Sequence, residues 1–242
     1  MDIIINGAGG RMGRALRSML EKKGAKAAAL IDPFVKEDGM LENLADYQGS
    51  ADCIIDFSNH AGTQQLLSYA LERKLPVVIC TTGHTPQELE LISQAAQIIP
   101  VFRSGNMSLG IAVLTRLVKD AAKMFPDADI EIVESHHNQK LDVPSGTALM
   151  LAHSVQAVRE DATLLVGRHE NGKRTRQEVG IHSLRMGNTV GIHEVIINTG
   201  TQILTLKHEA QDRSLFAEGA LSAAEFMIGK PAGLYNMDDI VG

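Results

Sequence analysis

Apolar residues in the first hundred positions fall into short β-branched runs separated by segments of helical spacing. The runs predict strands, and segments such as 62–74 and 86–97 predict amphipathic helices. The predicted strands cover residues 2–5, 26–31, 52–57, 76–80 and 98–102. Regular alternation of strands and helices is typical of a doubly wound parallel sheet, so the first part of the chain is predicted to be α/β.

The pattern changes after residue 108. Two helices are predicted around a strand at 129–134, and most of the following chain predicts strands, which indicates a mixed α+β sheet with its helices on one face. These elements are helices over 110–124 and 148–158 and strands over 163–167, 180–185, 189–198 and 201–208, the last two joined by a turn at 198–200. A helix over 213–228 is predicted to return to the first domain. We therefore expect one domain of residues 1–108 and 213–242 and another of residues 109–212.

A glycine-rich turn follows the first predicted strand. Ile3-Ile4-Ile5 leads into N-G-A-G-G-R-M-G at residues 6–13, and a helical pattern follows. This context favours a Rossmann-like dinucleotide site, with phosphates at the start of the helix and Asp32 accepting hydrogen bonds from ribose hydroxyls. The glycines fit either G-x-x-G-x-x-G or G-x-G with a late third glycine, and a tight turn without ligand is the alternative.

The other predicted strands of this domain also end in small or polar residues. These endings are Asp56-Phe57-Ser58, Thr81-Thr82-Gly83 and Ser104-Gly105-Asn106-Met107-Ser108. The carboxyl ends of parallel strands meet at one edge of a sheet, so together with the glycine turn they predict a continuous ligand cleft.

The stretch E-S-H-H-N-Q-K-L-D-V-P-S-G-T-A at residues 134–148 connects a predicted strand to a predicted helix. Pro144 suits the first turn of that helix. Ser145-Gly146-Thr147 would present backbone N–H groups and two hydroxyls where the helix dipole is positive. Such a turn binds phosphate or carboxylate groups.

Three proton-donating side chains, His136, His137 and Lys140, lie beside this turn. Their combination suits a small polyanionic substrate that must also receive a proton. Each residue alone is compatible with a solvated loop before a capped helix, but together they predict a catalytic loop. No metal site is predicted, because the side chains of two adjacent histidines on one strand point to opposite faces and cannot both bind one metal ion. The remaining strand and helix histidines are interpreted as core or surface residues: His153, His182, His193 and His208.

Composition agrees with a globular enzyme. The chain has 242 residues, 44% hydrophobic and 21% charged, with a net charge of −6 that argues against a general nucleic-acid surface. No stretch has the length and hydrophobicity of a membrane span, and no signal peptide is recognised, so a cytoplasmic location is expected. Cys53 and Cys80 lie in apolar runs and are expected to be buried, reduced thiols.

Five segments resemble the 4-hydroxy-tetrahydrodipicolinate reductase family, also called dihydrodipicolinate reductase, over nearly the whole chain. They are G-A-G-G-R-M-G-R from Gly7, T-T-G from Thr81, S-G-N-M-S from Ser104, the stretch at 134–148, and G-L-Y-N-M-D-D from Gly233. The resemblance implies a Rossmann-like domain completed by the last helix, and a central domain that binds substrate and assembles a homotetramer through its sheets.

The resemblance also implies roles for individual residues. The catalytic pair falls on His136, as general acid or base, and Lys140, as proton donor. His137, Gly146 and Thr147 match substrate-binding positions, and Ser145 is an additional contact. Arg213 matches a position near the hinge. Cofactor contacts fall on Gly7, Ala8, Gly9, Gly10, Arg11, Met12, Asp32, Cys80, Thr81, Thr82, Ser104, Gly105, Asn106 and Met107.

The implied reaction delivers hydride from NADH or NADPH to a cyclic, unsaturated dicarboxylate, and the electron-rich product then takes a proton. Asp32 is followed by Pro33 and Phe34 rather than by a basic residue, which favours NADH. Arg11 and Lys36 are nearby, so dual use with NADH preferred is expected. The alternatives are a Rossmann oxidoreductase for another small dicarboxylate and a non-enzymatic sensor of the nicotinamide pool.

Overall fold

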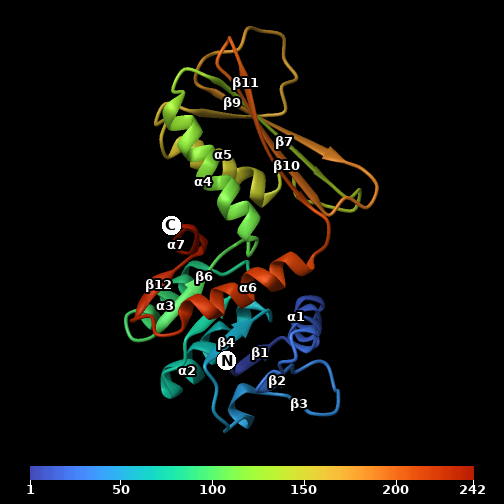
Figure 1. Cartoon of the computed structure of the whole chain (residues 1–242), viewed down its shortest axis with the longest axis vertical. Coiled ribbons are helices and arrows are strands. Elements are labelled where there is room, and N and C mark those ends of the chain that lie inside the picture. The colour runs from blue at the N-terminus through green and yellow to red at the C-terminus, as the bar shows by residue number, and fades with distance from the viewer. The chain divides into compact units, whose positions relative to one another are not determined.

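The computed structural model describes all 242 residues, and they divide into two compact units. Unit 1 comprises residues 1–108, 213–240 and 242, and unit 2 comprises residues 109–212 and 241. Each unit has its own sheet and its own apolar core (Figure 1). The chain therefore leaves unit 1 after residue 108 and returns to it at residue 213.

Unit 1 is built on a parallel sheet of seven strands in the order β12-β6-β5-β4-β1-β2-β3. Successive strands run outward from β1 in both directions, so the order reverses between β1 and β4. The strands are β1 Ile3–Asn6, β2 Ala29–Ile31, β3 Met40–Leu41, β4 Cys53–Asp56, β5 Val77–Ile79, β6 Pro100–Arg103 and β12 Gly233–Tyr235. This arrangement confirms the predicted Rossmann-like sheet.

Helices cover both faces of this sheet. Val101 of β6 belongs to the core cluster that includes residues of α2 and α3, whereas the ring of its neighbour Phe102 contacts Phe226 of α6 at a centroid distance of 6.4 Å. Successive strand residues point to opposite faces, so α2 and α3 lie on one face and α6 on the other. The helices are α1 Arg11–Lys22, α2 Thr63–Arg73, α3 Pro86–Ala96, α6 Ser214–Met227 and α7 Met237–Val241, with 3-10 turns at Leu44–Asp46 and His60–Gly62.

Unit 2 has a mixed sheet of five strands in the order β11-β10-β7-β9-β8. β10 is antiparallel to both of its neighbours, and the remaining pairs are parallel. The strands are β7 Asp129–His136, β8 Thr163–Val166, β9 Glu178–Arg185, β10 Gly191–Asn198 and β11 Ile203–Ala210, and the helices are α4 Leu109–Met124 and α5 Gly146–Gln156. Both helices pack beside the same sheet (Figure 1).

The helix-covered face of this sheet changes character along its strands. Near the start of β7 it carries Ile130 and Ile132, which pack with residues of α4 and α5. Two residues further in the same row comes Glu134, followed by His136. Register places His193 opposite Glu134, and Arg185 opposite His136. One surface thus provides an apolar core at one end and a buried polar group at the other.

The structure differs from the predicted elements mainly at short segments and ends. The strand predicted at 129–134 continues to His136, and the strand predicted from residue 26 begins at Ala29. The short elements β3, β12 and α7 were not predicted. β12 pairs in parallel with β6 and adds an edge strand from the end of the chain.

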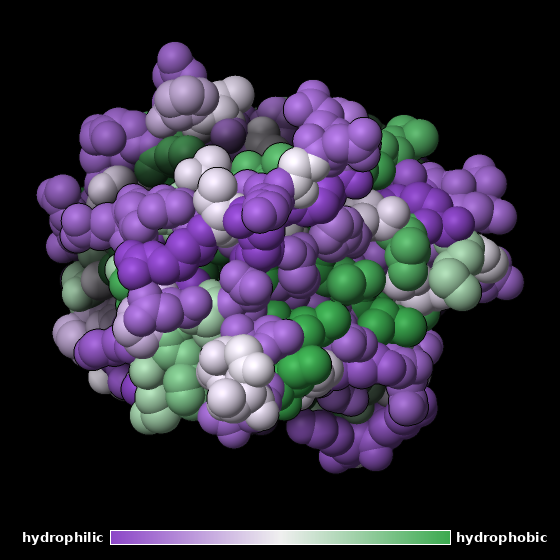
Figure 2. Space-filling view, turned by 90° about the horizontal axis from the view of Figure 1, so that it is seen from above, coloured by the Kyte–Doolittle hydropathy of each residue, from purple (hydrophilic) through white to green (hydrophobic).

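No helix reaches both the length and the hydrophobicity that crossing a membrane requires. On the face drawn in Figure 2, hydrophilic residues predominate and apolar residues gather in patches between them.

Candidate active site

The glycine turn between β1 and α1 is held by close backbone packing. Gly7 has φ of +80°, and a Cβ on it would lie 2.7 Å from the backbone of Phe57. A Cβ on Gly13 would lie 2.2 Å from the carbonyl oxygen of Gly7, so α1 packs directly on the turn. Both positions require glycine. Gly10 is the N-cap residue of α1 and gives no side-chain cap, so the first turn of α1 keeps amide groups for an anion.

Asp32 ties the glycine turn to the chain after β2. One carboxylate oxygen accepts a hydrogen bond from Gly9 N at 3.0 Å, and the other accepts from Phe34 N at 3.0 Å and Val35 N at 3.1 Å. Asp32 is buried. The protein therefore orients on both sides the carboxylate that was predicted to contact ribose.

Asp56 joins the carboxyl ends of three neighbouring strands. It accepts hydrogen bonds from Asn6 Nδ2 at 2.8 Å, Ser58 Oγ at 2.5 Å and Thr81 Oγ1 at 2.6 Å. Thr81 was predicted to contact the cofactor, and its hydroxyl is already directed by this bond. Cys80 precedes it, and burial, with Asp56 nearby, raises the pKa of the Cys80 thiol well above its ordinary value. Cys80 is therefore a neutral, free thiol.

The loop after β6 folds on itself and packs against α6. Ser104 Oγ donates to Asn106 O at 2.7 Å, and Asn106 Oδ1 accepts from Ser108 N at 2.9 Å. A Cβ on Gly219 of α6 would lie 1.6 Å from Met107 O, so only glycine allows this approach. The backbone of residues 104–107, which were predicted to contact the cofactor, thus packs directly on α6.

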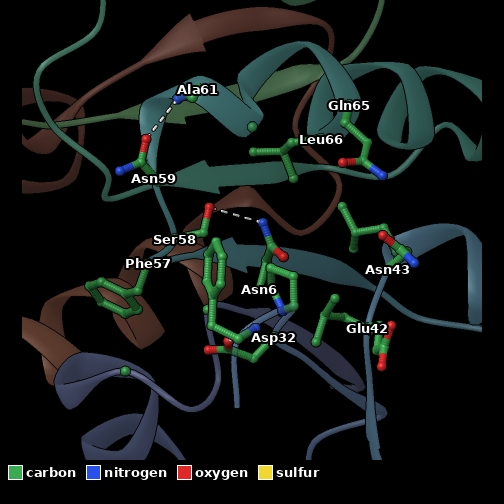
Figure 3. Close-up of a pocket in the computed structure, with 17 residues that line it drawn as sticks. Asn6, Asp32, Glu42, Asn43, Phe57, Ser58, Asn59, Ala61, Gln65 and Leu66 are labelled. Carbon is green, nitrogen blue, oxygen red and sulfur yellow. Dashed lines mark hydrogen bonds between the residues drawn. The ribbon is translucent and has the colours of Figure 1, made fainter. Parts of the chain in front are cut away.

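A cavity of about 630 Å³ opens at the carboxyl ends of β1, β2 and β4, where the strand order reverses. This is where open α/β sheets bind ligands. Figure 3 shows Asn6 and Ser58 joined by a hydrogen bond, with Asp32 and Glu42 also labelled around the opening. The lining includes the predicted residues Gly7, Gly10 and Asp32 and contains no lysine or arginine.

In unit 2, the carboxylate of Glu134 is the centre of the buried polar group. Oε1 accepts from Arg185 Nη2 at 2.8 Å and from Ser145 N at 3.2 Å. Oε2 accepts from Arg185 Nη1 at 2.9 Å and lies 2.5 Å from His136 Nδ1. Burial alone would raise the pKa of Glu134, but the hydrogen bonds from Arg185 and His136 lower it to about 2. The side chain is an anion with every oxygen paired, although its exposed fraction is 0%.

The His136 ring is fixed by this carboxylate. Ionised Glu134 can only accept hydrogen bonds, so Nδ1 of His136 must be the donor, and neutral His136 carries its lone pair on Nε2. Nε2 lies against Gly191, where a Cβ would approach it to 3.2 Å. Burial lowers the pKa of His136, while Glu134 acts in the opposite direction.

His193 packs edge-on against His136, with 5.1 Å between ring centroids. Its Nε2 lies 3.2 Å from Ser145 Oγ. Burial, with His136 nearby, lowers the pKa of His193 to about 4. His193 was interpreted from the sequence as a core or surface histidine, and the structure places it beside the predicted catalytic residue.

Ser145 is the N-cap residue of α5. Its hydroxyl accepts from Ala148 N at 3.2 Å, and its own N–H donates to Glu134. The helix begins at Gly146, so Pro144 precedes the cap and does not lie in the first turn as predicted. The reason is that the Ser145 hydroxyl caps the helix, so the first helical residue is Gly146. The amide of Gly146 lies in the first turn, where amides have no partner within the helix, and this is the kind of position at which anions bind.

Lys140 lies in the connection between β7 and α5. Its Nζ forms an ion pair of 2.8 Å with Asp142, and its N–H donates to His137 O at 3.1 Å. Arg185 Nη2 donates to Asp142 O at 2.8 Å. The predicted residues His136, His137, Lys140, Ser145, Gly146 and Thr147 all belong to unit 2, and the predicted cofactor residues all belong to unit 1.

Models of the dihydrodipicolinate reductase family match both parts of the chain. The model of the N-terminus matches residues 1–107, and that of the C-terminus matches residues 110–241. The chain belongs to the dihydrodipicolinate reductase family. The family consists of pyridine nucleotide-dependent oxidoreductases of lysine biosynthesis, so the resemblance stated from the sequence motifs is confirmed.

Relatives within this family extend over almost the same length. The 4-hydroxy-tetrahydrodipicolinate reductase of Clostridium novyi (strain NT) is 42% identical over 245 residues, covering 99% of this chain and 97% of that protein. The enzyme of the same name from Caldanaerobacter subterraneus subsp. tengcongensis is 43% identical over 244 residues, with the same coverage. A dipicolinate-bound dihydrodipicolinate reductase from Paenisporosarcina sp. TG-14 has the same fold, with a TM-score of 0.84 at 23% identity over 99% of both chains.

Sequence reasoning did not find Arg185, His193 or the role of Glu134. Alternation within β9 and β10 places Arg185 and His193 in the same rows as buried apolar residues, which is a visible signal. The pairing register and the covering of this face by α5 are needed to bring the three side chains together.

Proposed function

We propose that the protein reduces 4-hydroxy-tetrahydrodipicolinate to tetrahydrodipicolinate in the diaminopimelate route of lysine biosynthesis. A reduced nicotinamide gives up a hydride and is oxidised, one proton is taken up, and the 4-hydroxyl group leaves as water. The observation that carries this proposal is the arrangement of His136 beside the first turn of α5, in a chain whose two parts both match the reductase family. An oriented imidazole and a helix start suit a substrate that carries carboxylates and receives a proton.

In unit 1, the cofactor would be held by the turn at Gly7–Met12, by Asp32, by Cys80–Thr82 and by Ser104–Met107. The residues fit such a group, because Gly7 and Gly13 bring backbone close together at the start of α1 and because the cavity lies where the strand order reverses. When bound, the cofactor supplies the hydride. The protein's part there is to bind its phosphates and ribose and to orient its nicotinamide.

In unit 2, the amide of Gly146, with Thr147 and His137, would bind the substrate carboxylates. Ser145 contributes mainly by capping α5, since its hydroxyl accepts from Ala148 N. Protonated His136 gives up the proton at Nε2 and keeps the one at Nδ1 on its bond to Glu134. Lys140 is the second proton donor, held by Asp142 until substrate carboxylates compete for its charge.

NADH is the preferred cofactor in this proposal. The cavity is lined by the acidic Asp32 and Glu42 and by no basic residue, which disfavours a 2′-phosphate. Lys36 was expected to accept NADPH, but its Nζ forms an ion pair of 3.0 Å with Glu42. Arg11 is exposed at the start of α1 and allows some NADPH use.

The homotetramer remains a proposal, supported by the uncovered face of the sheet in unit 2. Val133 and Ile196 are only half-buried there, and Ile203 is 64% exposed. Apolar residues on an open sheet face favour pairing with another copy. Light scattering should give four times the chain mass of 26.1 kDa.

The test of the activity couples the purified protein to the synthase that condenses pyruvate with aspartate semialdehyde, and follows the oxidation of NADH and NADPH in parallel. Oxidation that needs both proteins and is faster with NADH supports the proposal and its cofactor preference. Binding of reduced nicotinamide without oxidation would indicate another dicarboxylate substrate or a sensing role.

A further inference from the structure

Arg185 connects the two residues to which proton transfer is assigned. Its guanidinium makes two parallel hydrogen bonds to Glu134, which in turn holds His136. The same guanidinium donates to the carbonyl of Asp142, whose carboxylate pairs with Lys140. Planar bidentate pairing fixes both position and orientation, which a lysine in the same place would not do.

The hydrogen bonds around Glu134 allow only one tautomer of His136. Each of its oxygens already has two donors, counting the His136 ring and the Ser145 amide. If the His136 proton moved from Nδ1 to Nε2, two acceptor atoms would face each other at 2.5 Å in a buried site. That arrangement is strongly unfavourable, so the partner dictates which nitrogen faces outward.

We propose that Glu134 and Arg185 are a pair of positioning residues for proton transfer. Glu134 holds His136 in the form with Nδ1 protonated, which leaves Nε2 as the atom that exchanges the proton. Arg185 holds Glu134 and the loop that carries Lys140, so it coordinates the two donors. The turnover part of this inference rests on the proposed reductase function, whereas the protonation of His136 does not.

The first experiment reads the protonated nitrogen of His136 in the wild-type protein, without substrate, from the ¹⁵N shifts of its ring in a long-range NMR spectrum at neutral pH. The expected result is a proton on Nδ1. A proton on Nε2 would overturn the inference whether or not the protein is active. This result also separates a failure of the positioning role from a failure of the proposed reaction.

The second experiment replaces Glu134 by glutamine and compares the variant with Glu131→Gln on the opposite face of the same strand. Glu131 also contacts an arginine and a histidine, Arg174 and His182. Glu134→Gln should lower kcat on the order of 100-fold, leave the KM for NADH unchanged, and lower the pKa seen in the pH profile of kcat, because the anion that favours protonated His136 is lost. Glu131→Gln should retain kcat within about twofold.

The third experiment uses two variants of Arg185, for the case in which Glu134→Gln does not fold. Arg185→Lys keeps the charge but loses the planar fork, and it should lower kcat less than Arg185→Met does. If both variants fold and keep the wild-type kcat and pH profile, the positioning role of Arg185 is wrong. Light scattering and circular dichroism on all variants show whether a change in kcat accompanies a change in assembly or fold.

Discussion

Two groups of glutamate, arginine and histidine lie on opposite faces of strand β7. On the face covered by α5, Glu134 has an exposed fraction of 0% and contacts Arg185 and His136. On the uncovered face, Glu131 is 32% exposed and contacts Arg174 and His182. The residue types and the strand are the same. The two groups differ in solvent access, and this decides which one has a fixed geometry. A buried charge needs all its hydrogen bonds from the protein, whereas water can supply them to a charge at the surface.

The comparison also explains why residue types alone do not identify a site. In the single chain, where this face is open, water competes for the hydrogen bonds of Glu131 and weakens its ion pairs. Around Glu134 no water is needed, since Arg185, His136 and Ser145 together occupy both carboxylate oxygens. The buried Glu134 can therefore fix which ring nitrogen of His136 carries the proton. The exposed Glu131 holds His182 less rigidly, because water can replace its hydrogen bonds.

The largest difference between the two faces is expected in turnover. His136→Ala should lower kcat by about 10²- to 10⁴-fold, because the group that transfers the proton is removed, and Lys140→Ala should act in the same direction. His182→Ala is the matched control and should keep kcat within about twofold. NADH affinity, measured by nicotinamide fluorescence, should stay nearly constant in all three. Wild-type turnover in both His136→Ala and Lys140→Ala would show that their roles are misassigned.

A second difference is expected in stability. Glu134→Gln removes a fully buried carboxylate from its partly buried partner Arg185, which is 18% exposed, and should lower the free energy of unfolding by about 3 kcal/mol. Glu131→Gln removes a partly exposed charge and should cost less than about 1 kcal/mol. Urea denaturation at neutral pH measures both values. Equal losses would mean that burial does not distinguish the two groups.

Two residues of the covered face, His193 and Glu134, should contribute to the pH dependence of stability in windows that adjoin near pH 4. Folding lowers the pKa of His193 from about 6.5 to about 4, so the folded state binds its proton less readily and stability falls as pH decreases through that interval. The contribution of Glu134 is present above its unfolded pKa and is lost as pH falls from about 4.5 towards 2. Wild type should lose about 2 kcal/mol more than His193→Gln between pH 7 and pH 4.5 in urea denaturation. Identical losses would exclude His193 as the cause.

The smallest effect is expected from two glycines that face the two groups. A Cβ on Gly191 would lie 3.2 Å from His136 Nε2, and a Cβ on Gly180 would meet the carboxylate of Glu131. Gly191→Ala should lower kcat on the order of tenfold by crowding the exchanging nitrogen. Gly180→Ala displaces the flexible end of Glu131 and should leave kcat unchanged. An unchanged kcat in Gly191→Ala would place proton exchange elsewhere on His136.

Patterns in the sequence predicted the parallel sheet and the glycine turn because both depend on local signals. The spacing of Gly7 and Gly13 reports a close backbone approach that only glycine permits, and strand runs such as Ile3–Ile5 consist of consecutive apolar, β-branched residues. β3 and β12 were missed because their two and three residues, Met-Leu and Gly-Leu-Tyr, include no β-branched residue and form no apolar run. Their pairing with β2 and β6 depends on tertiary contacts.

The candidate site was predicted in part for the same reason. His136, Lys140 and Ser145 lie close together in the sequence, so their combination is visible there. Arg185 and His193 join them only through the register of β9 and β10 with β7. The strand also continues two residues further than predicted, because Glu134 and His136 occupy inward positions that usually hold apolar side chains. Polar residues on a buried face weaken the alternation that marks a strand.

The return of α6 and β12 to unit 1 has a consequence for biosynthesis. While a ribosome makes residues 1–108, Phe102 lacks the Phe226 ring that packs on it, and β6 lacks its edge partner β12. Residues 109–212 emerge next and contain all the strands of their own sheet. Residues 109–212 can therefore fold to completion first, while residues 1–108 keep apolar surface exposed until residues 213–242 have been translated.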